Sequence, residues 1–187
     1  ADLLFHSATK FLSGHGTVIG GVLVDSGRFD WDASGRFPEL AAPYSGFHGM
    51  VFSDESTVGA FLLRARREGL RDFGACLSPH SAWLILQGLE TLSLRMDRHM
   101  SNTEKVAAFL ASHPLVGRVG HPLLESHPSH ALAQKLLKHG AKGAGAVFSF
   151  DIKGSREQGK AFIEALKIFS HLANVGDCRS LVIHPAS

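Results

Sequence analysis

Apolar residues near the start of the chain predict two short strands. Leu3-Leu4-Phe5 forms the first run, and residues 18–24 (Val-Ile-Gly-Gly-Val-Leu-Val) form the second. The second run is apolar on both faces, which is typical of an inner strand that is covered on both sides. The two glycines in the second run leave space for another backbone or a ligand to approach closely.

Apolar residues at helical spacing, and one alternating run, predict the later elements. The first is a helix over 56–69 with Val58 in its apolar stripe, and the second is a long helix from about Ser81 to Met96 with Pro79 in its first turn. After these we expect a helix over 102–112, a half-buried strand over 148–152, a helix over 156–168 and a strand over 181–183. The long helix is expected to leave a larger domain near Leu92. The elements that follow describe a small α+β domain, which divides the chain into domains 1–92 and 93–187.

Residues 25–55 are rich in Gly, Pro, Ser, Asp and aromatic residues and follow no period. Because linkers are poor in aromatic residues, we expect a long ordered loop. One interpretation is a surface excursion packed by its own rings. The other is a wall of a substrate entrance or a contact between subunits.

The composition is that of a globular protein. Hydrophobic residues make up 44% of the 187 residues, and charged residues make up 19%. The net charge is +2 and the Lys and Arg residues are scattered along the chain, which argues against a nucleic-acid-binding surface.

No apolar run approaches the roughly 20 residues needed to span a bilayer, and the chain opens without the basic stretch of a signal peptide. Cys76 and Cys178 are far apart in apolar surroundings, so we expect two buried thiols in a reducing compartment rather than a disulfide. A cytoplasmic protein with no membrane partner is therefore expected.

Three histidines in a proline-punctuated stretch, His121, His127 and His130, raise the possibility of a zinc site. Their spacing supports no regular ligand face and no cysteine joins them, so we expect surface histidines and no metal. The glycine-rich residues 140–145 precede a strand rather than a helix, which is the wrong order for a phosphate-binding loop.

The strongest candidate for chemistry is Lys10, which follows Ser7 and Thr9 and precedes a glycine-rich turn. A lysine amine whose charged form is disfavoured by burial or a nearby cation forms imines with carbonyl compounds. The two hydroxyls suit phosphate oxygens. Together these groups suit an aldehyde that carries a phosphate, as pyridoxal phosphate (PLP) does.

Three segments resemble the Cys/Met-metabolism PLP-dependent enzymes, a family that includes cystathionine γ-synthases and β-lyases, methionine γ-lyases and O-acetylhomoserine sulfhydrylases. The first segment contains Asp2-Leu3, Ser7-Ala8-Thr9-Lys10-Phe11-Leu12 and Gly14-His15-Gly16. The second runs from Leu77-Ser78-Pro79 through 88–96 (Gly-Leu-Glu-Thr-Leu-Ser-Leu-Arg-Met). The third runs from Val175-Gly176-Asp177 through His184-Pro185-Ala186-Ser187. The resemblance implies an α/β, fold-type I PLP-dependent transferase. This chain would be the C-terminal part of its large, mainly parallel-sheet domain plus a small α+β domain.

The resemblance also implies roles for single residues. Lys10 would be the Schiff-base lysine and would move protons at the substrate carbons, while Ser7 and Thr9 would bind the cofactor phosphate. Asn174 would bind the substrate carboxylate. From the residues alone, Ser7 and Thr9 are equally turn-capping hydroxyls and Asn174 a turn residue. His15 and His184 lie in the matching segments without an assigned role, and we expect structural hydrogen bonds from them.

Within the family, the aromatic loop and Asn174 favour the O-acetylhomoserine sulfhydrylases, which replace the acetyl group of O-acetylhomoserine with sulfide or a thiol. The first alternative is a cystathionine γ-synthase or a methionine γ-lyase. The second alternative is a non-catalytic fragment whose only role is packing between subunits. The resemblance implies a homotetramer and a chain of about twice this length. We therefore expect an inactive internal fragment that lacks three parts: an acid for the pyridine nitrogen, a ring-stacking aromatic and an arginine for the substrate carboxylate.

Overall fold

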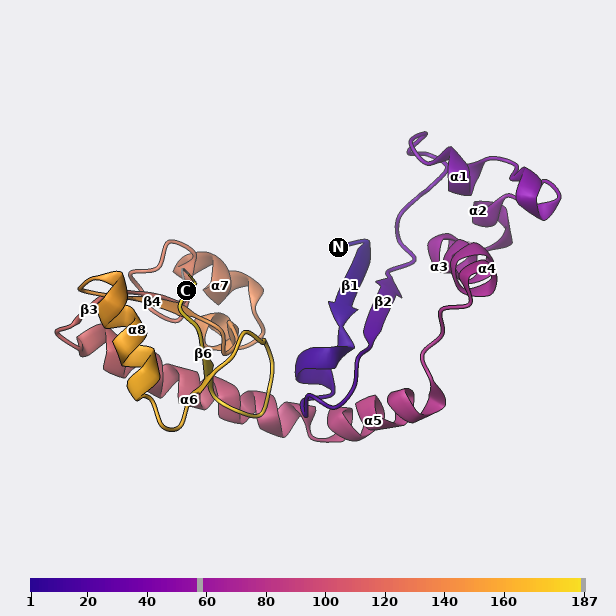
Figure 1. Ribbon diagram of the computed structural model, residues 1–187. Coiled ribbons are helices and arrows are strands. Elements are labelled where there is room, and N and C mark those ends of the chain that lie inside the picture. The colour runs from indigo at the N-terminus through magenta and orange to yellow at the C-terminus, as the bar shows by residue number, and fades with distance from the viewer. Residues whose placement is uncertain (57–58, 186–187) are drawn as a thin grey trace. The chain divides into compact units, whose positions relative to one another are not determined.

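The computed structural model describes residues 1–56 and 59–185, and the chain forms two compact units (Figure 1). The first unit contains Ala1–Thr9 and Val18–Ile85, and the second contains Lys10–Thr17 and Leu86–Ser187. The expected domains, 1–92 and 93–187, stay a prediction, because these units are groups of residues in mutual contact within this chain. Val58 of the expected helix stripe lies outside the described residues, as do Ala186 and Ser187 of the last matching segment.

An antiparallel pair of strands opens the first unit. Strand β1 (Leu3–Ser7) pairs with β2 (Gly21–Asp25), with Leu3 opposite Asp25 and Ser7 opposite Gly21. The expected second strand is present but begins at Gly21 rather than Val18. The expectation that both faces are covered is wrong for this chain: the β2 side chains keep 39–46% of their surface exposed. Among the described residues β1 is the only strand that pairs with β2, so no further layer of sheet shields these side chains.

Short helical segments interrupt the long aromatic loop. These are α1 (Pro38–Ala41), the turn Ser45–Phe47 and α2 (Phe52–Glu55). A longer helical run follows, made of α3 (Ala60–Arg64), the segment Ala65–Leu70 and α4 (Arg71–Phe73). It begins at Ala60, not at the expected Ser56, because Ser56 has an extended backbone (φ −151°) that ends α2.

The loop packs through its own rings. Phe52 is fully buried, together with Leu40 and Ala60, and six partly buried side chains surround them: Trp31, Tyr44, Phe47, Met50, Phe61 and Leu63. The Arg64 guanidinium lies 4.8 Å from the centre of the Tyr44 ring, a cation–π distance. These contacts support the first interpretation of the loop, a self-packed excursion. A role at a substrate entrance or subunit contact stays a prediction.

Helix α5 (Pro79–Glu90) has Pro79 in its first turn as expected and begins two residues before the expected Ser81, but the long helix does not continue unbroken to Met96. Thr91 (φ −104°, ψ 5°) separates it from α6 (Leu92–Ser112), which includes the expected helix over 102–112. The Thr91 hydroxyl and the Arg95 guanidinium both donate to the Gly88 carbonyl at this break. Side chains therefore bind a carbonyl at the point where α5 ends. No helix in the described part of the chain is long and apolar enough to cross a bilayer.

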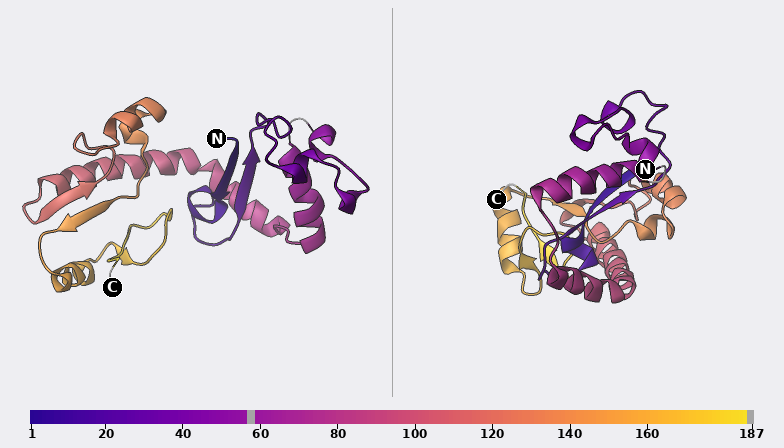
Figure 2. Two further views of the ribbon diagram at one scale, coloured as in Figure 1. Left: turned by 90° about the horizontal axis from the view of Figure 1, so that it is seen from above. Right: turned by 90° about the vertical axis from the view of Figure 1, so that its right-hand side faces the viewer.

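The second unit is built on an antiparallel pair, β3 (Val116–Gly120) with β4 (Ser149–Ile152). Helix α6 contacts β3 and runs along it (Figure 2). Helix α8 (Arg156–Ala165) contacts β4 through an edge-to-face pair of Phe162 and Phe150. Strand β4 confirms the expected strand, with one half-buried face and one wet face. Helix α8 ends three residues before the expected Ile168 because Leu166 is extended (ψ 135°).

Two strands and one α-helix of the second unit were not expected from the sequence: β3, β5 (Ser170–His171) and α7 (His130–Leu136). The expected last strand is present as β6 (Leu181–Val182), parallel to β5. Cys76 and Cys178 are exposed free thiols, so the expectation of buried cysteines is wrong. Both lie in irregular segments rather than in helices or strands that face a core.

Candidate functional site around Lys10

Lys10 lies in the helical turn Ala8–Leu12, directly after β1. Its backbone departs from helical angles (φ −95°, ψ −118°), so the turn is kinked at the lysine. The chain then folds back, and the Gly14 N–H donates to the Lys10 carbonyl at 2.7 Å. Gly14 has a φ of +71°, which an L side chain rarely adopts, and this explains a glycine four residues after the lysine.

The Lys10 amine contacts Asn174, a residue 164 positions away in the sequence. Lys10 Nζ donates to Asn174 Oδ1 at 2.5 Å in a partly buried contact within the second unit. None of the ion pairs of the described residues includes Lys10. The amine is therefore held by a neutral amide oxygen and not by a carboxylate, which would favour its charged form.

Ser7 and Thr9 lie in the first unit, one on each side of Ala8. The Thr9 hydroxyl donates to the Gly20 carbonyl at 3.3 Å and accepts from the Gly20 N–H at 3.1 Å. This is the turn-capping role that the residues alone allow. Ser7 is the last residue of β1 and stands opposite Gly21. Phosphate binding by the two hydroxyls stays a prediction.

The segment that contains Asn174 also packs against the residues after Lys10. Gly176 (φ +81°) approaches Phe11 so closely that an added Cβ would lie 2.6 Å from the Phe11 nitrogen. Asp177 accepts the Arg179 N–H at 2.9 Å, and this hydrogen bond lowers the pKa of the Asp177 carboxyl. The residue pattern predicts no role for Asp177, although an Asp next to Gly is a common turn signal.

The remaining histidines of interest have structural contacts. His15 Nδ1 lies 2.6 Å from the Ser13 carbonyl, as expected of a structural residue. The His184 ring lies beside Gly159, and its expected structural hydrogen bond stays a prediction. His121 is buried: its Nε2 donates to the Gly145 carbonyl at 3.1 Å and its Nδ1 accepts the Leu123 N–H at 3.0 Å. Burial was not expected for this histidine. It lowers the pKa of the His121 ring.

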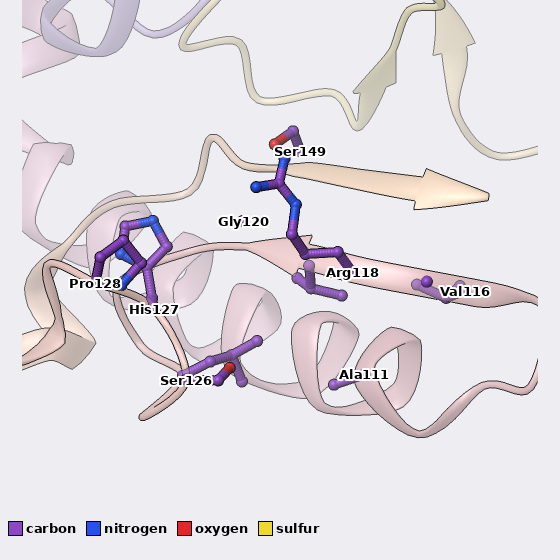
Figure 3. Close-up of a pocket in the computed structure, with 11 residues that line it drawn as sticks. Ala111, Val116, Arg118, Gly120, Ser126, His127, Pro128 and Ser149 are labelled. Carbon is purple, nitrogen blue, oxygen red and sulfur yellow. The ribbon is translucent and has the colours of Figure 1, made fainter. Parts of the chain in front are cut away.

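A hollow of about 500 Å³ lies elsewhere in the second unit, between α6, β3 and the stretch that contains His127 and Pro128 (Figure 3). Arg118 lines it, and its guanidinium pairs with Asp151 at 3.0 Å. None of the four predicted site residues lines this hollow. Among the described residues no cluster of His, Cys, Asp or Glu has the arrangement of a metal site.

Comparison with known proteins identifies the family. The sequence profile described as Cys/Met metabolism PLP-dependent enzyme matches residues 1–187. The chain belongs to this family. It is 52% identical over 187 residues to a homocysteine synthase of Schizosaccharomyces pombe, covering all of this chain and 43% of that protein. It is 49% identical to O-acetyl-L-homoserine sulfhydrylase 1 of Thermus thermophilus, covering 44% of that protein.

Solved structures of the family agree in fold. A putative O-acetylhomoserine (thiol)-lyase of Campylobacter jejuni, whose structure contains N'-pyridoxyl-lysine-5'-monophosphate, matches with a TM-score of 0.87 at 37% identity over all of this chain and 46% of that chain. A cystathionine γ-synthase of Xanthomonas oryzae matches with a TM-score of 0.70 at 32% identity and 39% coverage of that chain. The chain thus has a mixed α/β, fold-type I architecture, and it spans less than half the length of these relatives.

The donor groups around Lys10 fit the cofactor of the Cys/Met-metabolism family. PLP needs a primary amine that can react with its aldehyde and donors for its phosphate. Lys10 supplies an amine that no carboxylate pairs with among the described residues, and two of the three residues before it in the sequence, Ser7 and Thr9, carry hydroxyls. The family's chemistry and the residues of this chain are therefore compatible.

Proposed function

We propose that the protein is a PLP-dependent sulfhydrylase that replaces the acetyl group of O-acetylhomoserine with sulfide or a thiol, giving homocysteine or methionine. The observation that carries the proposal is the 2.5 Å contact of Lys10 with Asn174. It occurs in a chain that is about half identical, along its whole length, to a homocysteine synthase and a sulfhydrylase.

Lys10 is the residue that moves protons in this proposal. With PLP bound, its amine would hold the cofactor and would take and return protons at the substrate carbon atoms. Bound PLP would supply an electron sink for those carbons. The contact with Asn174 holds Nζ in one place without an ion pair.

Asn174 has two ends with different roles. Its Oδ1 accepts from Lys10, which leaves Nδ2 as the end that donates to a substrate carboxylate. Ser7 and Thr9 bind the cofactor phosphate through their hydroxyls. The Thr9 hydroxyl already donates to the Gly20 carbonyl and accepts from the Gly20 N–H. Because a hydroxyl has one donor and two acceptor sites, Thr9 would have to share its donor between Gly20 and the phosphate.

The proposal extends to the whole protein. Residues 1–92 belong to the large, mainly parallel-sheet PLP-binding domain and residues 93–187 to the small C-terminal α+β domain. The protein is a cytoplasmic homotetramer whose partners are the amino-acid substrate and the sulfur donor. The supporting observation is the likeness to fold-type I enzymes over the complete chain.

The test compares substrates with the intact protein. O-acetylhomoserine plus sulfide should yield homocysteine and acetate, whereas methionine alone should stay unchanged. Cystathionine and acetate formed from O-acetylhomoserine and cysteine would instead support the synthase, and methanethiol released from methionine would support the lyase. No turnover of any of these substrates, with PLP present, would support a piece that only packs subunits.

The attachment site is tested separately by borohydride reduction in the presence of PLP, followed by peptide mapping. A reduced phosphopyridoxyl group should be found on Lys10 and should disappear in Lys10→Ala, with loss of at least about a hundredfold in activity. The matched control is Lys138→Ala, which removes an exposed lysine. Labelling scattered over many lysines would contradict the role of Lys10.

A further inference from the structure

Arg95 on α6 binds the main chain of the turn that follows Lys10. Its Nη1 donates to the Phe11 carbonyl at 2.8 Å and its Nη2 to the Leu12 carbonyl at 3.3 Å. Nη2 also donates to the Gly88 carbonyl at 2.6 Å. One guanidinium therefore joins two consecutive carbonyls after the lysine to the end of α5.

The chemistry of these contacts is specific to arginine. Phe11 and Leu12 lie at the end of a helical turn, where carbonyls lack intrahelical partners and attract a cation. Arg95 is half-buried, and none of the ion pairs of the described residues includes it. Its charge therefore serves neutral carbonyls on two segments at once. A planar fork with donors on separate nitrogens spans such carbonyls more widely than the single nitrogen of a lysine ammonium.

Phe11 is held from two other sides as well. Its ring meets the His99 ring edge to face, with centroids 5.7 Å apart, and His99 lies one helical turn after Arg95 on α6. On another side Gly176 lies so close that an added Cβ would overlap the Phe11 nitrogen and ring. Burial and, second, the charge of Arg95 lower the pKa of His99. Phe11, the residue directly after Lys10, is thus held by contacts to its carbonyl and its ring.

Gly14 gives the guanidinium its space. A Cβ added at Gly14 would overlap the Arg95 guanidinium. The glycine after the lysine turn therefore serves two purposes: it adopts a φ of +71°, and it lets Arg95 reach the Phe11 and Leu12 carbonyls.

We propose that Arg95 is a positioning residue for Lys10. By binding the Phe11 and Leu12 carbonyls it holds the main chain next to Lys10, and so keeps the Lys10 amine at Asn174. The part of the proposal that concerns cofactor attachment rests on the proposed function of Lys10. The part that concerns the turn after Lys10 rests only on the contacts of Arg95 with the Phe11 and Leu12 carbonyls.

The test uses Arg95→Lys in the intact protein, because this variant keeps the charge and loses the fork. The first measurement is hydrogen exchange without added PLP. Amides of residues 11–16 should exchange at least about tenfold faster, as expected for losing charge-assisted hydrogen bonds, while β3 and β4 keep their protection. Arg98→Lys, on the exposed side of the same helix, is the matched control and should match the parent protein.

The second measurement is borohydride labelling of Lys10 at rising PLP concentrations. In Arg95→Lys the labelled fraction should stay at least about tenfold below that of the parent protein even when PLP is saturating, because the amine is misplaced rather than the cofactor weakly bound. Recovery to the parent level at saturating PLP would overturn the positioning role.

The outcomes separate this proposal from the proposed function. Unchanged exchange and labelling in Arg95→Lys, with Lys10 labelled in the parent, would overturn the role of Arg95 alone. Absence of Lys10 labelling in the parent would overturn the function, and the exchange of residues 11–16 would then decide whether Arg95 holds the turn. If Arg95→Lys fails to fold, Thr91→Val removes the 3.2 Å hydrogen bond that Arg95 Nε donates to the Thr91 hydroxyl, together with that hydroxyl's own bond to the Gly88 carbonyl. Unchanged exchange of residues 11–16 in that variant would overturn the proposal.

Discussion

At the scale of single residues, Asn174 offers Lys10 an amide oxygen at 2.5 Å, and a carboxylate in the same place would affect the amine differently. An amide accepts a hydrogen bond from either protonation state. A carboxylate forms an ion pair that stabilises the ammonium form. The type of residue at position 174 therefore bears on the pH at which Lys10 can react.

Asn174→Asp tests this dependence. A carboxylate at Asn174 should move the pH of half-maximal labelling of Lys10 by PLP and borohydride upward by about one to three units. Asn102→Asp makes the same chemical change on the exposed side of α6 and should leave the pH profile where it is. A profile that moves equally in both variants would show that general electrostatics, and not the contact with Asn174, is responsible.

A second residue-scale prediction concerns His121. Burial lowers the pKa of its ring, so the folded state holds the neutral form and the unfolded state binds a proton more readily. The His121 contribution to stability is thus fully present above about pH 6.5, the ordinary histidine value, and is lost as the pH falls below it. Protonation of Nδ1 would also remove the acceptor of the Leu123 N–H.

His121→Gln should lower the free energy of unfolding by about 1–3 kcal/mol at pH 7.5, because the Leu123 N–H loses its acceptor. The loss relative to the parent should shrink as the pH falls from 7 to 5. Urea unfolding at several pH values measures both effects, with exposed His139→Gln as the control. A constant difference over this pH range would contradict the assignment.

At the scale of elements, the end of α5 is shaped to receive the turn after Lys10. Gly88 stands inside α5, where glycine normally costs stability, and an added Cβ would lie 2.6 Å from both the Cα and the carbonyl carbon of Ser13. The close approach explains the glycine. The helix end and the turn are therefore packed against each other through main-chain atoms.

Gly88→Ala should destabilise the second unit by about 1–3 kcal/mol and reduce PLP labelling of Lys10, because the Ser13 main chain must shift. Gly69→Ala is the matched control, since Gly69 is also helical and has open space around its Cα. That control should be neutral or stabilising by up to about 1 kcal/mol. Thermal unfolding and peptide mapping measure the two effects. Equal behaviour of both variants would show that Gly88 is not a packing glycine.

At the scale of the whole molecule, the described chain has two separate groups of contacts. The aromatic cluster around Phe52 stabilises the first unit, and α6 with β3 and β4 forms the second. Few side chains are fully buried in either, so single large residues contribute much of the stability. Each unit is expected to respond to changes in its own cluster first.

Phe52→Ala removes the most buried ring and should cost about 3–5 kcal/mol. Hydrogen exchange should rise over residues 29–55 while amides of β3 and β4 keep their protection. Phe73→Ala removes a ring that is 87% exposed and should change stability little. A uniform loss of protection over both units would show that they unfold as one.

The sequence predicted elements well where a pattern was long or had a clear start signal. Pro79 marks the start of α5, and alternation around Phe150 marks β4. It failed where local signals were weak. Strand β3 contains two glycines in five residues and was not recognised, and the break at Thr91 depends on side chains that bind the Gly88 carbonyl.

The sequence by itself determined the family, and it marked the lysine and the hydroxyls beside it as candidates, because these are contiguous residues whose types and order match the family. Only the tertiary structure decided that Asn174 contacts Lys10 across 164 residues, and that Arg95 binds the turn after it. Arg95 stood within a matching segment, yet its partners are main-chain carbonyls. Every residue has such a carbonyl, so no pattern of residue types can mark which of them a folded chain brings to one guanidinium.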